Sequence, residues 1–586
     1  MLWMLISTAC PGGGGPADSL VIFGESPFKK PISGVCLLSL VIASFISYSF
    51  AIFVVMFSKK GLGLLTAALA AQTCAASANK IRDEHATCKK TTVAILGGGM
   101  AGVAAAQALS NSSIHDFVII EYRDTLGGRV AHTDFGKGPN GKPYTVELGA
   151  NWVQGLGSPG GPENPIWTFA KKWGLNNTYS NYSSILTYNE TGYVDYSSLL
   201  DDYETLVEDA YDAAGVLLTE NGQDQTARTG LALAGWRPKI DDMARQAVEW
   251  WEWDWEDAYS PDESSFIFGV AGQNLTFNQY SDENNYVWDQ RGYNRIILKE
   301  ASTFLKDNDP RVQLNSIITN VTYSDNGVTI HKEDGSCVSA AYAICTFSLG
   351  VLQNNAVSFS PSFPDWKQTA IEKFTMGTYT KIFLQFNETF WPRDTQYFLY
   401  ADPVSRGYYP VWQSLSAPGF IPESNIIFVT VVSQESYRVE RQSDEQTQKE
   451  VMAVLRKMYP DLDIPEPTAF MYPRWSTTPW SYGSYSNWPP STTLEMHENL
   501  RANVNRLWFA GEATSAQYFG FLHGAWFEGR DAGERIAELL GGKCAKTDTS
   551  GTCGNRKHWE RLYGSSPLAD YSVFDGWDVS SFYSSY

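Results

Sequence analysis

Residues 92–102 read Thr-Val-Ala-Ile-Leu-Gly-Gly-Gly-Met-Ala-Gly, and a second apolar run over 117–120 ends at Glu121. A short β-branched run that enters a glycine turn, followed by an Ala-rich segment over 101–109, predicts a strand, a turn and a helix. The second apolar run predicts another strand, so the whole unit has the order of a dinucleotide-binding fold. This stretch predicts an α/β protein with a dinucleotide at its first turn.

Each glycine of the turn has its own physical role. Gly97 permits the tight turn, Gly99 lets the backbone approach a pyrophosphate, and Gly102 lets the helix pack closely on the sheet. Met100 and Ala101 open the helix, whose free amide groups attract a phosphate anion. The acid that ends the second strand is placed to accept hydrogen bonds from a ribose. A glycine-rich turn without a ligand is the alternative, and the flanking strand, helix and acid argue against it.

Two further motifs indicate which dinucleotide is bound. Gly127-Gly128-Arg129 follows the acid, and residues 147–152 read Glu-Leu-Gly-Ala-Asn-Trp. Together they resemble motifs of the flavin amine oxidase family, in which the first touches the FAD diphosphate and the second runs beside the flavin ring. The resemblance implies that FAD contacts six residues here: Gly128, Arg129, Gly149, Ala150, Asn151 and Trp152.

A third motif lies near the end of the chain, where residues 505–514 predict a strand running into Glu512 and residues 520–525 open a helix. In flavin amine oxidases the corresponding Gly-Glu contacts the ribityl and diphosphate of FAD. The start of the next helix, here Phe521 and Leu522, faces the flavin carbonyl. A helix dipole at that position stabilises negative charge on the reduced ring.

The middle of the chain resembles the polyamine oxidase branch of this family, from about Thr92 to Leu540. Matching segments follow the family order at 289–293, 348–353, 379–384, 435–447 and 485–489. Ile317, in a predicted strand, matches the position whose backbone meets the adenine. The resemblance implies a Rossmann-like FAD-binding domain that is interleaved with an α+β substrate-binding domain.

The resemblance and the predicted elements together set the expected boundaries. The FAD-binding domain is expected to be discontinuous, at 91–175, 276–366 and 479–545. The substrate-binding domain is expected at 176–275 and 367–478, and the tail at 546–586. Within these ranges we expect helix over 198–255, strands over 313–330, 340–346 and 380–386, and a loop over 348–352.

Lys381 is the expected catalytic residue. In this family a lysine holds a water against the reactive ring nitrogen of the flavin. A lysine on a strand among Tyr379, Ile382 and Leu384 is partly desolvated, which lowers its pKa and suits it to proton transfer. The alternative is a strand-end lysine that reaches solvent.

Aromatic residues are expected to form the walls of the substrate site. By resemblance, Tyr485 and Phe521 flank the amine on the substrate face of the flavin, and Tyr379 and Trp475 belong to the same chamber. Stacked aromatic rings exclude water and hold an amine by cation–π attraction. The family pairing is inverted here, with Tyr at 485 and Phe at 521.

The acidic part of the site departs from the family pattern. Plant polyamine oxidases carry a Glu directly after the Asn-Trp-Val of the flavin-side motif, and this chain has Gln154. Another family acid matches Glu256, in the alternating aromatic and acidic run 250–257. That run fits a groove for a flexible polycation, and the alternative is an amphipathic helix end with solvated acids. Loss of one carboxylate relaxes specificity toward acylated polyamines.

The implied function is FAD-dependent polyamine oxidation. A secondary amine of spermine, spermidine or an acetylated derivative loses hydride to FAD, O2 is reduced to hydrogen peroxide, and the imine hydrolyses to an aldehyde. FAD is expected to be non-covalent, because no cysteine lies between Trp475 and Phe521. Three alternatives stay open: a monoamine oxidase, an L-amino-acid oxidase in which Arg474 clamps the carboxylate, and a non-catalytic secreted flavoprotein.

The composition restricts the possible partners. The net charge is 44 minus 64, or −20, without a long basic tract. Nucleic acid is therefore excluded as a partner, because phosphate binding needs clustered Lys and Arg. An acidic surface attracts a cationic substrate, and we expect a monomer.

Residues 1–78 are expected to form a leader outside the fold. A complete secretory signal is expected over 56–78, with translation beginning at Met56 and residues 1–55 being an extension introduced by the gene model. The rival reading is a membrane anchor over the uncharged run 32–57, which is long enough to cross a bilayer. Seven sequons favour a secreted glycoprotein: Asn111, Asn176, Asn181, Asn189, Asn274, Asn320 and Asn387.

Cysteines give weaker predictions. Five follow the leader, and their spacing shows no zinc-type pairing, so no metal site is expected. Cys544 and Cys553 flank a short segment and are a possible disulfide in an oxidising compartment. Cys345 lies in an apolar strand and is expected to be a buried core residue.

Overall fold

Strand β1 (Lys89–Leu96) lies inside an eight-stranded sheet, between β2 (Phe117–Ile120) and β13 (Cys337–Cys345), and is parallel to both. The computed structural model describes residues 88–219, 222–277 and 279–541, which belong to one compact unit that begins at Ala86. The sheet order is β10-β2-β1-β13-β12-β11-β14, and β22 also pairs with β13. The predicted strand, turn, helix and strand of the opening stretch are therefore present.

The other strands of this sheet come from segments far apart in the sequence. They are β10 (Val312–Gln313), β11 (Ile318–Ser324), β12 (Gly327–Lys332), β14 (Ser358–Ser360) and β22 (Leu507–Phe509). Apart from the first two residues of β1, all lie in the ranges predicted for the FAD-binding domain. Parallel pairing places the ends of β1, β2 and β22 at one edge of the sheet, and the predicted cofactor motifs follow these ends.

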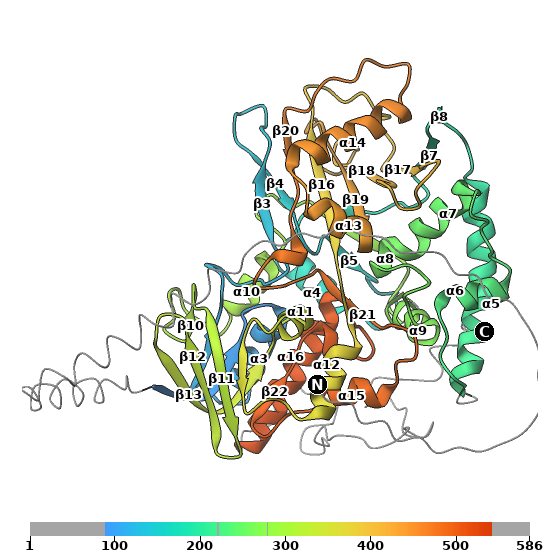
Figure 1. The fold of residues 1–586 in the computed structure, drawn as a ribbon. Helices are drawn as coiled ribbons and strands as arrows, with labels where there is room; N and C mark the ends of the chain where they lie inside the picture. Colours follow the sequence, from blue (N-terminus) through green and yellow to red (C-terminus); the bar gives the residue numbers. More distant parts are fainter. Residues whose placement is uncertain (1–87, 220–221, 278, 542–586) are drawn as a thin grey trace, which may run out of the picture. The chain divides into compact units, whose positions relative to one another are not determined.

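Helices α3 (Met100–Asn111) and α16 (Leu522–Leu539) pack against each other beside this sheet (Figure 1). A Cβ atom at Gly529 would lie 2.1 Å from the carbonyl oxygen of Ala101, and one at Gly533 would lie 2.5 Å from that of Ala105. The two helices therefore touch through their backbones. This contact brings the first and the last predicted cofactor motifs together.

A seven-stranded sheet forms the second layer, in the order β20-β16-β19-β18-β17-β7-β8. Its strands are β7 (Ile185–Asn189), β8 (Gly192–Tyr193), β16 (Tyr379–Gln385), β17 (Tyr397–Ala401), β18 (Val411–Ser414), β19 (Ile426–Val432) and β20 (Ala469–Met471). All fall in the ranges predicted for the substrate-binding domain. The sheet interior is almost completely buried, and β16 carries Lys381 within it.

Three small sheets connect these parts. They are β5-β9-β6 (Trp152–Gln154, Asn284–Val287, Asn177–Tyr179), β3-β4 (His132–Phe135, Tyr144–Glu147) and β15-β21 (Thr375–Gly377, Tyr485–Asn487). Their strands carry Trp152, Gln154 and Tyr485, three of the residues predicted for the site. The site is therefore held by paired strands.

The remaining helices cover both sheets and the junction between them. They are α4 (Pro165–Lys172), α5 (Ser198–Thr219), α6 (Ala227–Ala234), α7 (Met243–Glu249), α8 (Trp255–Asp257), α9 (Phe266–Phe277), α10 (Arg295–Ala301), α11 (Leu349–Gln353), α12 (Asp365–Lys373), α13 (Ser433–Glu440), α14 (Asp444–Met458) and α15 (Leu494–Arg501). A π-helical turn, Trp250–Asp254, joins α7 to α8.

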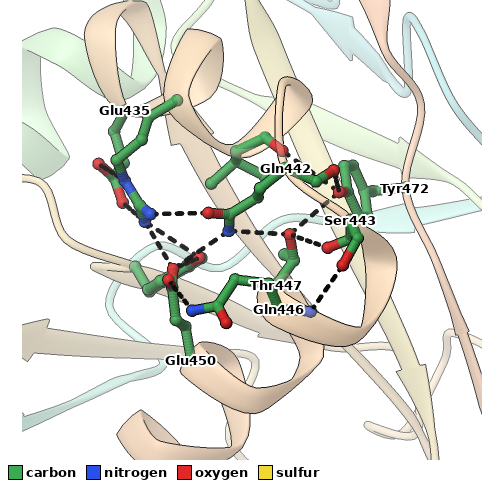
Figure 2. A network of polar contacts seen from close by, with 10 residues as sticks. Glu435, Gln442, Ser443, Gln446, Thr447, Glu450 and Tyr472 are labelled. Atoms are coloured by element: carbon green, nitrogen blue, oxygen red, sulfur yellow. Dashed lines mark hydrogen bonds and ion pairs between the residues drawn. The ribbon is translucent and has the colours of Figure 1, made fainter.

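A polar network joins α13 to α14 behind β16 (Figure 2). Arg438 donates to Glu435 at 2.6 Å and to Glu450 at 2.8 Å. Gln442 donates to the Thr447 hydroxyl at 2.9 Å, and the buried Tyr472 hydroxyl joins the same cluster. The two helices are thereby fixed as one block against the sheet that holds Lys381.

Some sequence predictions were wrong in detail. The loop predicted over 348–352 is the short helix α11, because the Ser348 hydroxyl caps it by accepting from the Val351 amide at 3.1 Å. The helix predicted over 198–255 is divided, since Gly235 ends α6 in the left-handed conformation. Ile317 lies one residue before β11 and not inside it.

The cysteines also differ from the prediction. Cys88 and Cys337 form a disulfide that joins the starts of β1 and β13, a pairing that their separation of 249 residues concealed. Cys345 is the buried free cysteine that was predicted. Cys544 and Cys553 lie outside the described residues, as do the leader and the tail. Within the described ranges, none of the helices combines the length and the apolar character that a membrane span requires.

Candidate functional site

A cavity of about 470 Å³ lies at the carboxyl ends of β1, β2 and β22 and extends toward the second sheet. All but two of the site residues predicted from the sequence line it. They are Gly97, Gly99, Met100, Ala101, Glu121, Gly128, Arg129, Gly149, Ala150, Asn151, Trp152, Gln154, Glu256, Ile317, Tyr379, Trp475, Tyr485, Glu512, Phe521 and Leu522. The exceptions are Gly102 and Lys381, which lie just behind the wall.

The glycine turn is shaped as the spacing predicts. Gly97 has a φ of +110°, which L side chains rarely adopt. A Cβ atom at Gly102 would lie 2.0 Å from the Gly97 carbonyl oxygen, so this glycine serves packing and does not line the cavity. Gly99 faces Gly128, where a Cβ atom would lie 3.2 Å from the Gly99 Cα. Two backbone segments thus approach each other at the cavity wall.

Two helix N-termini open onto the cavity. The N-cap of α3 is Gly99 and that of α16 is Phe521, and neither supplies a side-chain hydrogen bond. The first amide groups of each helix therefore remain available to an anion, and the helix dipole favours negative charge there. The N-terminus of α3 suits a diphosphate, and the N-terminus of α16 suits an electron-rich ring.

Glu121 is held rigidly at the end of β2. Its carboxylate accepts from the Gly98 amide at 2.6 Å and from the Arg123 amide at 2.8 Å. Burial raises the pKa of Glu121, and these two amide bonds oppose that shift. Each oxygen keeps a second lone pair, so the residue fits the predicted role toward a ribose.

Glu512 and Arg129 join the two ends of the cofactor region. Arg129 donates to Glu512 at 2.7 Å and to the Ser484 carbonyl at 2.9 Å. Glu512 also accepts from the Ser486 hydroxyl at 2.6 Å and from the Gly520 amide at 2.9 Å. The carboxylate is therefore occupied by protein donors and sets the geometry of the wall around it.

These observations test whether the wall suits FAD. A glycine cradle, two helix N-termini without side-chain caps, a held acid and Ile317 all line a single cavity. Each element matches one chemical part of the dinucleotide. The residues present fit FAD.

Lys381 is buried on β16, with 1% of its surface exposed. Its Nζ donates to the Gly149 carbonyl at 2.8 Å and to Asn151 Oδ1 at 2.7 Å. Both acceptors line the cavity, so the amine lies directly behind the predicted flavin-side motif. The alternative of a solvent-reaching lysine is wrong.

A second buried charge accompanies Lys381. Glu147 accepts from the Tyr293 amide at 2.6 Å, and its other oxygen has no hydrogen-bond partner among the described residues. Burial raises the pKa of Glu147 and lowers the pKa of Lys381, and attraction between the two groups opposes both shifts. The nearby acid therefore favours the protonated form of the lysine.

Aromatic rings form the wall on the substrate side. The rings of Tyr379 and Tyr485 lie 6.1 Å apart, and Trp152 meets Trp255 edge-on at 5.5 Å. Trp475 is 3% exposed and donates to the Leu148 carbonyl at 3.4 Å. Such faces attract a cation and keep water away from it.

The Phe521 ring lies on His523, with the centroids 5.2 Å apart. Burial lowers the pKa of His523 to about 3, so the ring that supports Phe521 stays neutral. The Asn164 amide bonds the His523 ring at 3.3 Å and the Gln154 carbonyl at 2.9 Å, which ties Phe521 to the opposite wall.

Gln154 and Glu256 meet inside the cavity. Gln154 Nε2 donates to Glu256 Oε1 at 2.7 Å, and the Tyr485 hydroxyl donates to the Glu256 backbone carbonyl at 2.7 Å. Burial raises the pKa of Glu256 to about 7, and the Gln154 hydrogen bond opposes this rise. In the described part of the chain, the acid has no basic side chain as a partner.

The acidic run around Glu256 divides into two groups. Asp254 is 3% exposed and paired with Arg406 at 2.6 Å, and burial raises the pKa of Glu252 to about 8. Glu256 and Asp257 line the cavity instead. The alternative prediction, an amphipathic helix end with solvated acids, is therefore wrong for this run.

Several residues of the site were not predicted. Tyr182, Trp480 and Asp257 line the cavity, and of these only Asp257 lay in a run that the sequence marked. Glu440, at the end of α13, accepts from Thr380 at 2.6 Å and from the Trp475 amide at 3.1 Å. It links Trp475 to the strand of Lys381, and nothing in the sequence pattern predicts such a contact.

The residues of the lining bear on flavin attachment and on the amino-acid oxidase alternative. Arg129 is the only basic residue among the described residues of the wall, and no cysteine or histidine occurs among them. Arg474 points elsewhere, to Asp444 at 2.7 Å, so it clamps no carboxylate in the cavity. Within the described ranges, no group of three His, Cys, Asp or Glu is placed to hold a metal ion.

Comparison with known proteins shows the family of this chain. The sequence profile of the family described as flavin containing amine oxidoreductase matches residues 100–537. Polyamine oxidase 1 of Zea mays is 37% identical over 480 residues, 78% of this chain and 93% of that protein. Polyamine oxidase 7 of Oryza sativa subsp. japonica is 36% identical over 455 residues, 75% of this chain and 93% of that protein.

Solved structures share the fold. A wild-type putrescine oxidase with putrescine bound superposes with a TM-score of 0.60 at 16% identity, over 78% of this chain and all of that one. A single mutant from a redesign of cofactor binding in putrescine oxidase gives a TM-score of 0.62 over 77% of this chain and all of that one. With a matched profile that covers most of the chain, the protein belongs to the flavin-containing amine oxidase family, the oxidoreductases that act on CH–NH donors.

Proposed function

We propose that the protein is an FAD-dependent polyamine oxidase. It oxidises a secondary amine of spermine, spermidine or an acetylated derivative, with O2 reduced to hydrogen peroxide and the imine hydrolysed to an aldehyde. One observation carries this proposal: Glu256 is a carboxylate in an aromatic cavity and lacks a basic partner among the described residues. A buried acid without a protein cation calls for a cationic ligand.

The substrate end binds and orients the amine. Glu256 attracts an ammonium group, and Tyr485 and Phe521, which line the cavity, flank the amine and hold it by cation–π attraction. The amine that reacts must be deprotonated to lose hydride, and an apolar aromatic surrounding favours its neutral form. The described cavity thus separates a charged end at Glu256 from a neutral reacting end.

Lys381 is the proton-transferring group behind the flavin-side motif, and Asn151 of that motif holds its amine in place. Asn151 accepts from Lys381 and donates to the Val287 carbonyl at 2.9 Å, so its orientation is fixed. The Lys381 amine thereby lies directly behind the cavity wall, where it can accept a proton from the site and donate it back during the reaction. FAD, when bound, supplies the hydride acceptor and passes the electrons to O2.

FAD is non-covalent in this proposal, because the described wall carries neither the cysteine nor the histidine that flavin attachment uses. Acid precipitation tests this directly. Yellow flavin that leaves with the supernatant supports the proposal, and flavin that stays on the protein contradicts it.

Secretion is part of the proposal. The Cys88–Cys337 disulfide supports an oxidising compartment, and the sequons Asn111, Asn176 and Asn387 are exposed. The protein is proposed to act as a monomer, with a membrane tether only if 32–57 is an anchor. Protein in the medium that shifts in mass with an N-glycosidase supports this, and unglycosylated protein inside the cell contradicts it.

A peroxide assay decides among the possible substrates. Spermine, spermidine and their acetylated forms are compared with tyramine and leucine at equal concentration. Polyamines are expected to give the highest kcat/KM. Faster turnover of tyramine indicates a monoamine oxidase, faster turnover of leucine indicates an amino-acid oxidase, and no peroxide from any amine indicates a non-catalytic flavoprotein.

A further inference from the structure

Gln154 and Glu256, which both line the cavity and bond to each other, each have one further side-chain oxygen. Because a carboxylate only accepts, the group of Gln154 that faces Glu256 must be the amide NH2. The amide oxygen of Gln154 therefore points away from that bond. In the described part of the chain, neither this oxygen nor Glu256 Oε2 accepts a hydrogen bond from protein.

Both oxygens are open to a ligand. The two residues line the cavity, and neither atom belongs to the buried polar atoms that lack a partner. One oxygen carries the charge of the carboxylate and the other is a neutral acceptor. The pair therefore offers one negative charge and two hydrogen-bond acceptors.

The surroundings hold this pair in place. Gln154 is on β5, which pairs with β9, and its backbone carbonyl accepts from Asn164 at 2.9 Å. The Tyr485 hydroxyl donates to the backbone carbonyl of Glu256 and so holds the backbone at this residue. These bonds fix the backbone at both residues, and the hydrogen bond from Gln154 Nε2 to Glu256 Oε1 holds the two side chains against each other.

We propose that Gln154 is a specificity-determining residue, and that with Glu256 it binds a polyamine segment carrying one positive charge beside a neutral N–H group, as in a mono-acylated polyamine. The ammonium group meets Glu256 and the amide N–H donates to the Gln154 oxygen. A fully charged polyamine would place a second ammonium group against an acceptor that has no charge. This inference rests on the proposed function.

Kinetics of peroxide formation test the proposal at pH 8.5, with spermine and N1-acetylspermine as substrates. In Gln154→Glu the second carboxylate is expected to lower the KM of spermine about tenfold relative to that of N1-acetylspermine, with kcat within about twofold. In Gln154→Leu the neutral acceptor is lost, and the KM of N1-acetylspermine is expected to rise about fivefold. Gln223→Glu is the control, because it adds the same charge at an exposed position outside the cavity wall.

The outcomes separate this inference from the proposed function. Wild-type protein that forms no peroxide from any amine contradicts the proposed function. Wild-type protein that is active, while the KM ratio of the two substrates stays within about twofold of the wild-type ratio in both Gln154 variants, overturns the role of Gln154 alone. A shifted ratio in Gln223→Glu would show that distant charge is responsible, and would also overturn it.

Discussion

Arg129 and Glu512 lie 383 residues apart in the sequence and form an ion pair of 2.7 Å at the cavity wall. The pair reaches further, since Glu512 also bonds Ser486 and the Gly520 amide. Several distant chain segments thus meet at one carboxylate. Arg129, Ser486 and Gly520 all donate hydrogen bonds to Glu512, so Glu512 supplies the negative charge of this cluster.

Replacing Glu512 with Gln is expected to weaken FAD binding about 10- to 100-fold. The amide keeps the size but loses the charge, and hydrogen bonds to a charged group contribute about 1.5–3 kcal/mol. Flavin fluorescence during titration of the apoprotein measures the Kd. Glu388→Gln, at an exposed position, is the control, and an unchanged Kd in Glu512→Gln would contradict the assignment.

Lys381→Met is expected to lower the rate of flavin reduction about 10²- to 10⁴-fold, which is the usual range for loss of a proton-transferring group. Anaerobic stopped-flow absorbance with spermine measures this rate. Lys449→Met removes a lysine from the exposed face of α14 and should leave it unchanged. Equal rates in the two variants would remove Lys381 from the mechanism.

The pH dependence of KM should report on Glu256. Burial raises its pKa to about 7, so the carboxylate becomes neutral and the KM for spermine rises as pH falls through that value. Glu256→Gln is expected to raise KM at pH 8 at least about tenfold and to abolish this dependence. A KM profile of the same shape in the variant would argue against Glu256.

Stability should depend on pH through Glu252. Burial raises its pKa from 4.5 to about 8, so between these values the folded protein binds a proton that the unfolded chain has lost. The free energy of unfolding therefore falls as pH rises through this window. Glu252→Gln should be more stable than wild type at pH 8.5, by about 1 kcal/mol or more, and equal to it at pH 4. Urea titrations at both values measure the difference, and equal stability at pH 8.5 would contradict it.

The Cys88–Cys337 disulfide should contribute to stability and not to chemistry. It closes a loop of 249 residues, and removal of a native disulfide costs about 2–5 kcal/mol. The double variant Cys88→Ser with Cys337→Ser should unfold at lower urea with kcat unchanged at 25 °C. A loss of kcat without a loss of stability would contradict this expectation.

The cofactor half of the site was predictable because its chemistry is local. Gly97, Gly102 and Glu121 act through spacing along one strand, turn and helix, and a spacing is visible in a sequence. Glu512 was found through the resemblance of residues 505–514 to a motif of the flavin amine oxidase family, and it lies three residues beyond the end of β22. The arrangement of each motif is set by its neighbours in the chain, and only their meeting needed the fold.

The substrate half was less predictable because its contacts are between distant segments. The bond of Gln154 to Glu256 joins residues 102 apart, and Glu440 links Thr380 to Trp475. No periodicity encodes such contacts. The helix over 349–353 was missed because its segment is short and contains a glycine, both of which disfavour a helix. The Ser348 hydroxyl stabilises the helix by capping its N-terminus.

The backbone contact between α3 and α16 has a consequence for how such enzymes diversify. Where Gly529 meets Ala101 there is no space for a side chain. A larger residue at Gly529 would push the two helices apart, so their contact is a fixed joint of the fold. The segments between its two halves are free to lengthen or exchange loops while the joint keeps its ends aligned. A new amine preference can then arise by remodelling these segments, and the inherited template for the dinucleotide is left intact.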